Sequence, residues 1–187
     1  MKILKNSLGI SHEIVGKVVR AGDIVVDATA GNGSDTLFLA KLVGELGHVY
    51  SFDVQRFALE NTRQRLQAEE MIERVTLIKA GHQNIDQYVG TGIKAVMFNL
   101  GYLPGGDHAI HTKAETTIAA ISKSLDLLLS HGIVAIVIYH GGDSGFEEKN
   151  AVMEFLQALD YRRYSVLMHQ FINQIHCPPI AVCIEKL

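Results

Sequence analysis

Several features that would restrict this sequence to specialised classes of protein are absent from it. Cysteine is scarce: the 187 residues include only Cys177 and Cys183, too few for a disulfide framework, so we expect reduced thiols and a cytoplasmic protein. No apolar run approaches the roughly 20 residues of a membrane-spanning helix, and residues 1–15 lack the cleavage site of a signal peptide. The formal net charge of −3 leaves no excess of basic residues. Any contact with nucleic acid must therefore come from a local patch.

What the sequence does contain is an alternation of strand-like and helix-like segments. The strand-like segments are short and apolar, as is typical of strands buried on both faces of a parallel sheet, and they cover residues 23–29, 48–54, 75–81, 94–100 and 132–139. The helix-like segments cover residues 34–43, 55–71, 112–130 and 146–160, and residues 1–20 are expected to form a leading helix. This βαβα order predicts a three-layer α/β fold. Without a linker or an internal repeat, we expect one domain over residues 1–187.

The alternation of strand-like and helix-like segments stops after residue 160. Residues 164–171 and 180–187 are both strand-like, and no helix lies between them. We therefore expect an antiparallel hairpin at one edge of the sheet. An ordinary dinucleotide-binding fold would continue with crossover helices instead.

A tight turn follows the first strand, in the stretch VVDATAGNGSDTLFLA. Asp27 ends the strand, Gly31 and Gly33 allow the backbone to turn sharply, and a helix begins directly afterwards. The pattern resembles the start of a G-x-G-x-x-G fingerprint, but Thr36 stands in place of the third glycine. This difference and the acid before the turn argue against a pyrophosphate and favour a ligand that carries an amine.

Two further strand ends complete the expected ligand. Asp53 ends the second strand, where a carboxylate accepts hydrogen bonds from both ribose hydroxyls. The third strand leads into residues 79–84, where an adenine edge would be read. A ligand with adenosine at one end and an amino acid at the other is S-adenosylmethionine. The alternative is that Asp27 and Asp53 only cap turns. The expected cofactor-binding residues are Asp27, Thr29, Ala30, Gly31, Asn32, Gly33, Asp35, Thr36, Asp53, Gln55, Gly81, His82, Asn84 and Asn99.

These motifs resemble those of the class I S-adenosylmethionine-dependent methyltransferases. That resemblance implies a Rossmann-like, seven-stranded, mostly parallel sheet in the order 3-2-1-4-5-7-6, with strand 7 antiparallel. The segments DATAGNGSDTLFLAKLVGELGHVYSFDVQ, NLGYLPGGD, YHGG and NQIHCPP are more narrowly similar to a small bacterial family that was long labelled as rRNA methylases. That family is now associated with methylation of the 5-aminomethyl group on tRNA wobble (2-thio)uridine. The resemblance therefore implies a tRNA-modifying N-methyltransferase that acts on the anticodon region.

Asn99 and Tyr102 have the spacing of the N-P-P-Y motif of enzymes that methylate amino groups, although Leu100 and Gly101 replace the two prolines. In that motif an Asn side-chain oxygen accepts a hydrogen bond from the target nitrogen, and the aromatic ring packs on the base. The alternative is a Gly/Pro-rich loop with an incidental tyrosine.

An alkylamine is mostly protonated at neutral pH and must lose a proton before it attacks. Asp107 is the first candidate for binding the ammonium or taking its proton, and His140 is the second; His108 and Tyr139 lie in the same loops. The alternative for each histidine is an ordinary polar loop residue. His108 and His111 have H-x-x-H spacing but no third ligand nearby, so we expect no metal site.

Other polar residues are candidates for contacting the substrate. Asn173, Gln174 and His176 lie between the last two strand-like segments and are expected at the mouth of the site. Possible phosphate contacts come from Arg162, Arg163, Lys2 and Lys5, with solvated surface as the alternative.

Two other functions remain open on the sequence. The protein could methylate rRNA or a small molecule, or it could be a non-catalytic adenosine-binding module. NLGYLPGGD argues against a pure binding module, because such a module needs no loop that accepts an amine. The sequence leaves open whether the protein forms a homodimer.

Overall fold

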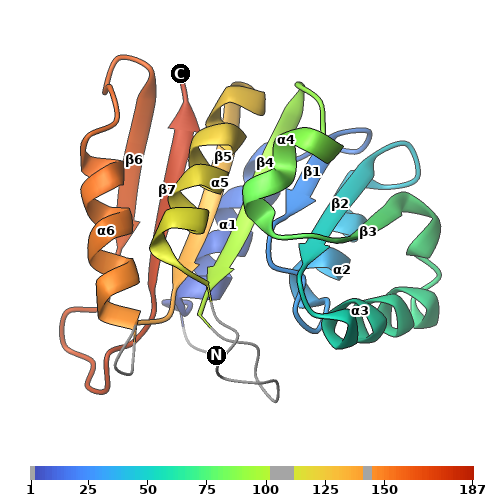
Figure 1. Ribbon diagram of the computed structural model, residues 1–187, viewed down its shortest axis with the longest axis horizontal. Helices are drawn as coiled ribbons and strands as arrows, with labels where there is room; N and C mark the ends of the chain where they lie inside the picture. Colours follow the sequence, from blue (N-terminus) through green and yellow to red (C-terminus); the bar gives the residue numbers. More distant parts are fainter. Residues whose placement is uncertain (1–2, 102–111, 141–144) are drawn as a thin grey trace.

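A seven-stranded sheet in the order β3-β2-β1-β4-β5-β7-β6 forms the centre of the molecule (Figure 1). A computed structural model describes residues 3–101, 112–140 and 145–187. The strands are β1 (Ile24–Asp27), β2 (His48–Asp53), β3 (Val75–Lys79), β4 (Ile93–Leu100), β5 (Leu128–Ile138), β6 (Tyr164–His169) and β7 (Ile180–Lys186). Neighbouring strands are parallel except that β7 is antiparallel to both β5 and β6. The expected fold class, strand order and terminal hairpin are confirmed.

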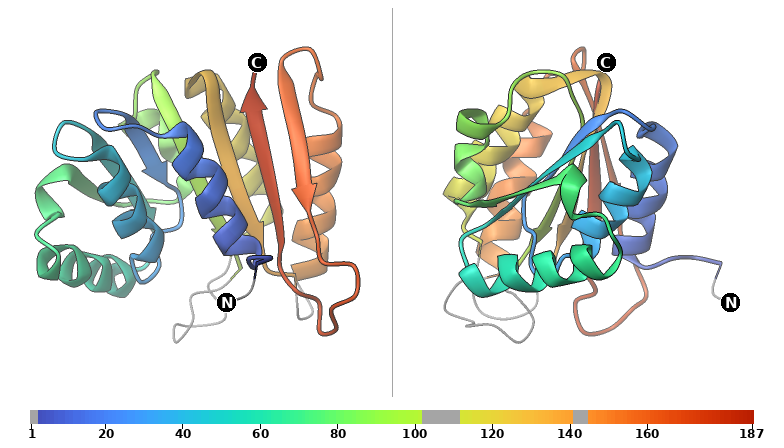
Figure 2. Two further views of the ribbon diagram at one scale, coloured as in Figure 1. Left: turned by 180° about the vertical axis from the view of Figure 1, so that it is seen from behind. Right: turned by 90° about the vertical axis from the view of Figure 1, so that its right-hand side faces the viewer.

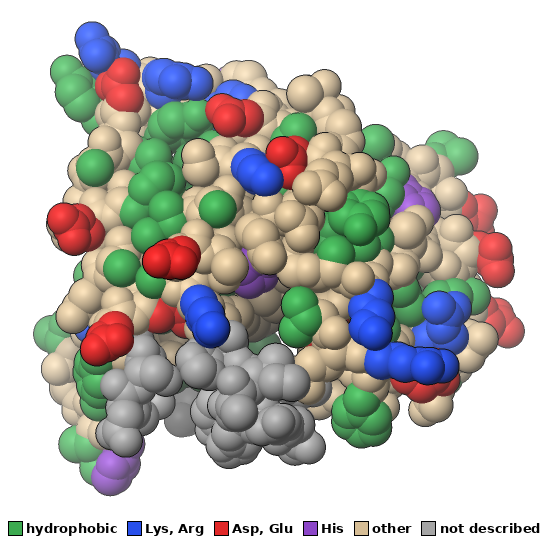
Figure 3. Space-filling model, in the orientation of Figure 1, with side chains coloured by type: hydrophobic (Ala, Val, Ile, Leu, Met, Phe, Trp, Pro, Cys, Tyr) green, Lys and Arg blue, Asp and Glu red, His purple; other side chains and the backbone are tan. Residues whose placement is uncertain are grey.

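Helices cover both faces of the sheet. They are α1 (Ser7–Val18), α2 (Ser34–Val43), α3 (Arg56–Ala68), α4 (Ile85–Tyr88), α5 (Ala114–Leu127) and α6 (Gly145–Gln157), with 3-10 helices η1 (Ile72–Arg74) and η2 (His82–Asn84). Figure 2 shows α1, α2 and α3 on the face opposite α5 and α6. None of the described helices is long and apolar enough to cross a membrane, and charged side chains are interspersed with apolar ones on the face drawn in Figure 3.

The core is divided by the sheet, because alternate residues of a strand point to opposite faces. On β1, Val25 packs with the cluster beneath α1, α2 and α3, whereas Val26 packs with the cluster beneath α4, α5 and α6. Both side chains are fully buried. This burial on both faces explains why the sequence shows nearly continuous apolar runs rather than alternation.

Two predicted helix boundaries are wrong. The leading helix was expected from residue 1, but residues 3–6 are not helical and α1 begins at Ser7. Helix-like residues continue to 130 in the sequence, but α5 ends at Leu127 and β5 begins at Leu128. The carbonyls at this point find partners outside the helix: Lys186 Nζ lies 2.9 Å from the oxygen of Leu125 and 2.8 Å from that of Leu128. Gly92 also donates its N–H to the Leu127 carbonyl at 3.0 Å. These tertiary hydrogen bonds override local helix propensity.

The turn after β1 is fixed against α3. Gly33 has a φ of 79°, in the left-handed region, and a Cβ atom at this position would lie 2.8 Å from the Thr62 Cα atom. The Thr62 hydroxyl donates to the Gly31 carbonyl at 3.1 Å, and Asn61 Nδ2 donates to Asn32 Oδ1 at 3.0 Å. The glycine therefore provides both a backbone conformation and a close approach that other residues do not permit.

Gly33→Ala is expected to lower the free energy of unfolding by more than about 1–2 kcal/mol, the cost of a left-handed conformation for an L-residue, because the methyl group also meets the Thr62 backbone. Gly16→Ala is the matched control. Gly16 lies in α1 with open space around it, so alanine there should stabilise by roughly 0.5–1 kcal/mol. Urea denaturation of both variants measures the difference. Equal stability of the two variants would show that the turn does not depend on its contact with α3.

Candidate active site

A cavity of about 750 Å³ opens at the edge of the sheet where β1 to β5 end. This is the edge at which parallel α/β sheets place their ligands. Most of the predicted cofactor-binding residues line it: Thr29, Ala30, Gly31, Asn32, Asp35, Asp53, Gln55, Gly81, His82 and Asn99. The predicted residues that do not line the cavity are Asp27, Gly33, Thr36 and Asn84. The same cavity also collects residues that sequence reasoning missed, among them Leu8, Thr112, Lys113 and Thr116.

Asp27 lies behind the turn rather than in the cavity, contrary to the expectation that its carboxylate faces a ligand amine. It is fully buried, its Oδ2 accepts a hydrogen bond from the Thr36 hydroxyl at 2.6 Å, and its Oδ1 accepts one from the Thr29 N–H at 3.1 Å. Burial, with the neighbouring Asp35 charge as a second cause, raises the pKa of Asp27 to about 7. Asp27 lies at the end of a strand as predicted, but its side chain organises the turn instead of facing a ligand.

Asp35 presents its carboxylate to the cavity instead. It is 4% exposed, and His12 Nε2 lies 2.7 Å from its Oδ1. Because a carboxylate only accepts hydrogen bonds, the proton lies on His12 Nε2. The His12 ring stacks on Phe38 with a centroid distance of 3.9 Å. No local sequence pattern identifies His12, because its partner Asp35 is 23 residues away on another helix.

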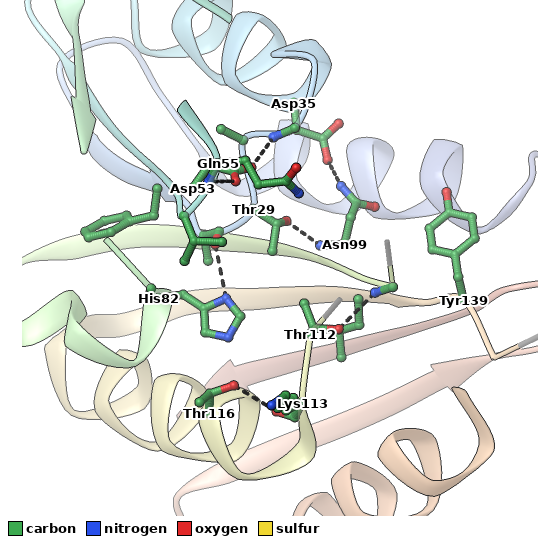
Figure 4. A pocket seen from close by; sticks show the side chains of 18 of the residues that line it. Thr29, Asp35, Asp53, Gln55, His82, Asn99, Thr112, Lys113, Thr116 and Tyr139 are labelled. Atoms are coloured by element: carbon green, nitrogen blue, oxygen red, sulfur yellow. Dashed lines mark hydrogen bonds between the residues drawn. The ribbon is translucent and has the colours of Figure 1, made fainter. Parts of the chain in front are cut away.

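The orientation of the Asn99 side chain follows from Asp35. Asn99 Nδ2 donates to the Asp35 carboxylate, and the Asn99 backbone N–H donates to Thr29 Oγ1 at 2.7 Å. The other end of the amide, Oδ1, is buried and has no hydrogen-bond partner among the described residues. Figure 4 shows this oxygen on the side of Tyr139. An unsatisfied buried acceptor costs free energy, so the site is prepared for a donor.

Tyr139 and His140 follow β5 and line the same cavity. Burial, and secondarily the Asp35 charge, raise the pKa of the Tyr139 phenol. His140 is buried, with Nδ1 3.4 Å from the Ile138 carbonyl and its ring edge-on to Phe146. Both predicted partners in the loop after β4, Tyr102 and Asp107, lie outside the described residues, as do His108 and His111.

Asp53 lies on the cavity wall at the end of β2. Its Oδ2 accepts from the Gly31 N–H at 2.9 Å and its Oδ1 accepts from the Gln55 N–H at 2.8 Å. Burial raises the pKa of Asp53, and these backbone hydrogen bonds oppose that rise. A carboxylate has about four acceptor positions, so Asp53 can accept further hydrogen bonds from a ligand.

His82, in η2, is buried and neutral. Its Nδ1 lies 3.3 Å from the Ala28 carbonyl, which can only accept, so Nδ1 carries the proton and Nε2 is an acceptor. Nε2 is buried without a partner in the described part of the chain, and burial lowers the pKa of the imidazole. Figure 4 shows the ring between Asp53 and Thr116. The sequence indicated the position of His82 but not its tautomer.

The beginning of α5 forms the opposite wall. The Gly101 N–H donates to the Thr112 hydroxyl at 2.9 Å, and that hydroxyl donates to Glu148 Oε2 at 2.7 Å. Glu148 is buried and also accepts from the Thr117 hydroxyl at 2.8 Å. This carboxylate of α6 therefore holds the end of β4 and the start of α5 in place around the cavity.

The start of α1 and the loop before β7 both contribute to the lining of the cavity. The Ser7 hydroxyl of α1 donates to the Pro179 carbonyl, and Pro179 and Cys177 line the cavity next to Leu8. The predicted substrate residues Asn173, Gln174 and His176 are exposed on the same loop but do not line the cavity.

The basic residues predicted as phosphate contacts are mostly engaged elsewhere. Arg162 forms a bidentate ion pair with Asp160, at 3.0 and 3.1 Å, and Lys5 forms an ion pair with Glu13 at 3.3 Å. Arg163 lies over the Tyr164 ring, and Lys2 lies outside the described residues. Within residues 3–101, 112–140 and 145–187, no group of three or more His, Cys, Asp or Glu side chains is placed to hold a metal ion.

Comparison with known proteins agrees with this geometry. The family model described as "Putative rRNA methylase" matches residues 49–185. The protein named tRNA (mnm(5)s(2)U34)-methyltransferase, chloroplastic, of Arabidopsis thaliana is 32% identical over 97% of this chain and 70% of its own length.

Solved structures are similar over the whole chain. One from Clostridium thermocellum, which carries the same description as the family, is 57% identical with a TM-score of 0.98 and covers 100% of both chains. A "putative methyltransferase" from Streptococcus mutans, solved in complex with SAH, is 41% identical with a TM-score of 0.92 and covers 99% of this chain and 100% of its own. The chain therefore belongs to the Putative rRNA methylase family, and it is an S-adenosylmethionine-dependent methyltransferase.

Proposed function

We propose that this protein methylates the amine of the 5-aminomethyl group on the wobble (2-thio)uridine of tRNA. The observation that carries the proposal is the buried Oδ1 of Asn99, which has no partner among the described residues and which Asp35 holds in one orientation at the cavity. The N–H of a substrate amine would supply a donor to this oxygen. The name of the Arabidopsis relative supports tRNA as the substrate, whereas the description of the family supports rRNA as the second candidate.

We assign the cofactor to the half of the cavity formed by the ends of β1, β2 and β3. Asp53 would accept hydrogen bonds from the ribose hydroxyls, and His82 would accept one at the adenine edge through its unprotonated Nε2. The turn at Thr29 to Asn32 would hold the amino-acid end, with Asp35 beside it. When bound, S-adenosylmethionine supplies a methyl group on a sulfonium with an excellent leaving group.

The chain's own task is then to position a neutral amine and to exclude water. Asn99 Oδ1 would accept an amine N–H and so direct the nitrogen lone pair toward the methyl group. Asp35 prevents the amide from turning its NH₂ group toward the amine, because a carboxylate accepts only from Nδ2. For the ammonium proton, Asp107 is the first candidate base and His140, on the cavity wall, is the second.

The direct test uses the purified protein, S-adenosylmethionine, and both tRNA and ribosomal RNA from a strain lacking the gene. Mass spectrometry of the nucleosides is expected to detect a new 5-methylaminomethyl group on wobble uridine and no new methyl group in rRNA. Methylation of rRNA alone would replace the proposal by its second candidate.

Asp53→Ala is expected to weaken S-adenosylmethionine binding at least tenfold, because hydrogen bonds to a charged group contribute about 1.5–3 kcal/mol. Asp160→Ala is the control, since that carboxylate pairs with Arg162 and does not line the cavity. Titration calorimetry measures the S-adenosylmethionine affinity of both variants. Unchanged affinity of Asp53→Ala would remove Asp53 from the ribose site.

Asn99→Ala is expected to leave cofactor affinity nearly intact and to slow methyl transfer by on the order of 10²-fold, the effect of a misplaced nucleophile. Asp35→Asn should share this deficit, because a second amide no longer fixes which end of Asn99 faces the amine. Asn84→Ala, an asparagine off the cavity wall, is the control. Single-turnover assays on unmethylated tRNA provide the rates. Full activity of Asn99→Ala would exclude it as the amine acceptor.

A further inference from the structure

A second, basic hollow lies on the outer part of the sheet, between α3 and β3. Arg56 and Arg63 of α3 and Lys79, the last residue of β3, line it together with one acid, Glu60. All three cations are exposed, and none forms an ion pair or a side-chain hydrogen bond with the described residues. Figure 3 shows Lys and Arg side chains gathered over α3 and β3, at the lower right of the molecule. The hollow thus carries an excess of positive charge.

This arrangement differs from that of many other cations in the described chain, which are neutralised locally. Lys41, for example, pairs with Glu69 at 3.0 Å, and Arg162 pairs with Asp160. Glu60 forms no ion pair with these cations among the described residues; its Oε1 accepts a hydrogen bond from Gln64 Nε2 at 3.2 Å. Three cations that line one hollow and form no ion pair within the described part of the chain are a local feature, because the net charge of the whole chain is −3.

The hollow begins at the edge of the sheet that carries the cavity. Arg56 directly follows Gln55, which lines the cavity, and Lys79 is the register partner of Asp53 on β2. Arg63 lies seven residues further along α3, about 10 Å at 1.5 Å per residue. The cations therefore form a row that leads from the cavity mouth along α3.

We propose that this hollow binds the phosphodiester backbone of the RNA whose target nucleotide enters the cavity. The inference rests on the proposed function, because it assumes an RNA substrate. An extended row of exposed cations suits a chain of phosphates, and arginine forms two parallel hydrogen bonds to each phosphate it meets. Phe57 follows Arg56 on α3 and does not line the hollow, but it is 61% exposed and offers an aromatic ring of the kind on which unpaired bases stack.

Charge reversal at two residues that line the hollow tests the proposal. Arg63→Glu and Lys79→Glu are expected to weaken tRNA binding on the order of tenfold and to lower the slope of log affinity against log salt by about 0.7–0.9 per lost phosphate contact. Arg65→Glu makes the same change of charge on α3 outside the hollow and should do neither. Phe57→Ala should weaken binding without changing the salt slope. S-adenosylmethionine affinity and the thermal midpoint of each variant verify that folding is intact.

The outcomes separate this inference from the proposed function. In one outcome, the wild-type protein methylates tRNA, but Arg63→Glu and Lys79→Glu bind tRNA as tightly as Arg65→Glu does and with an unchanged salt dependence. The hollow is then not the RNA site, whereas the proposed function stands. If wild-type protein methylates only rRNA and the same two variants bind rRNA weakly, the function fails and the RNA-binding surface stands. Binding to anionic lipid vesicles but to neither RNA would overturn the inference.

Discussion

The carboxylate of Asp35 is the group on which the rest of the site depends. It accepts hydrogen bonds from His12 of α1 and Asn99 of β4, so one side chain at the start of α2 connects three elements across the edge of the sheet. Its charge also contributes to the raised pKa values of Asp27 and Tyr139. Because a carboxylate accepts and never donates, this single group determines the orientation of an amide that otherwise has two equivalent positions.

Much of the fold was predictable because its signals are local. Buried parallel strands give continuous apolar runs, and the absence of a helix between residues 171 and 180 identified the terminal hairpin. The strand ends also located the cavity, since parallel strands finish at one edge. The depth at which a side chain is buried was not predictable from the sequence. Asp27 and Asp53 both end a strand, yet Asp27 is fully buried and Asp53 lines the cavity. His12 was missed because only the folded chain brings α1 to Asp35.

The cavity and the hollow, the two surfaces on which we propose that the RNA is recognised, differ physically. The cavity is partly apolar, and its polar atoms include Asn99 Oδ1 and His82 Nε2, both buried and without a partner among the described residues. The hollow beside α3 is lined by arginine and lysine side chains, whose long stems allow several positions of a ligand. A small donor-specific site next to a permissive electrostatic surface suits an enzyme that modifies one group on a large polyanion.

The position of β7 has a consequence for synthesis of the protein. β7 follows β6 in the sequence but lies between β5 and β6 in the sheet. While a ribosome makes α6 and β6, the edge of β5 that faces away from β4 therefore has no partner strand, and β6 cannot yet pair with any strand of the described sheet. Unpaired edges of this kind attract other strands. The nascent chain thus passes through an aggregation-prone interval that ends only when β7 inserts, and chaperones that bind extended apolar segments would act during that interval.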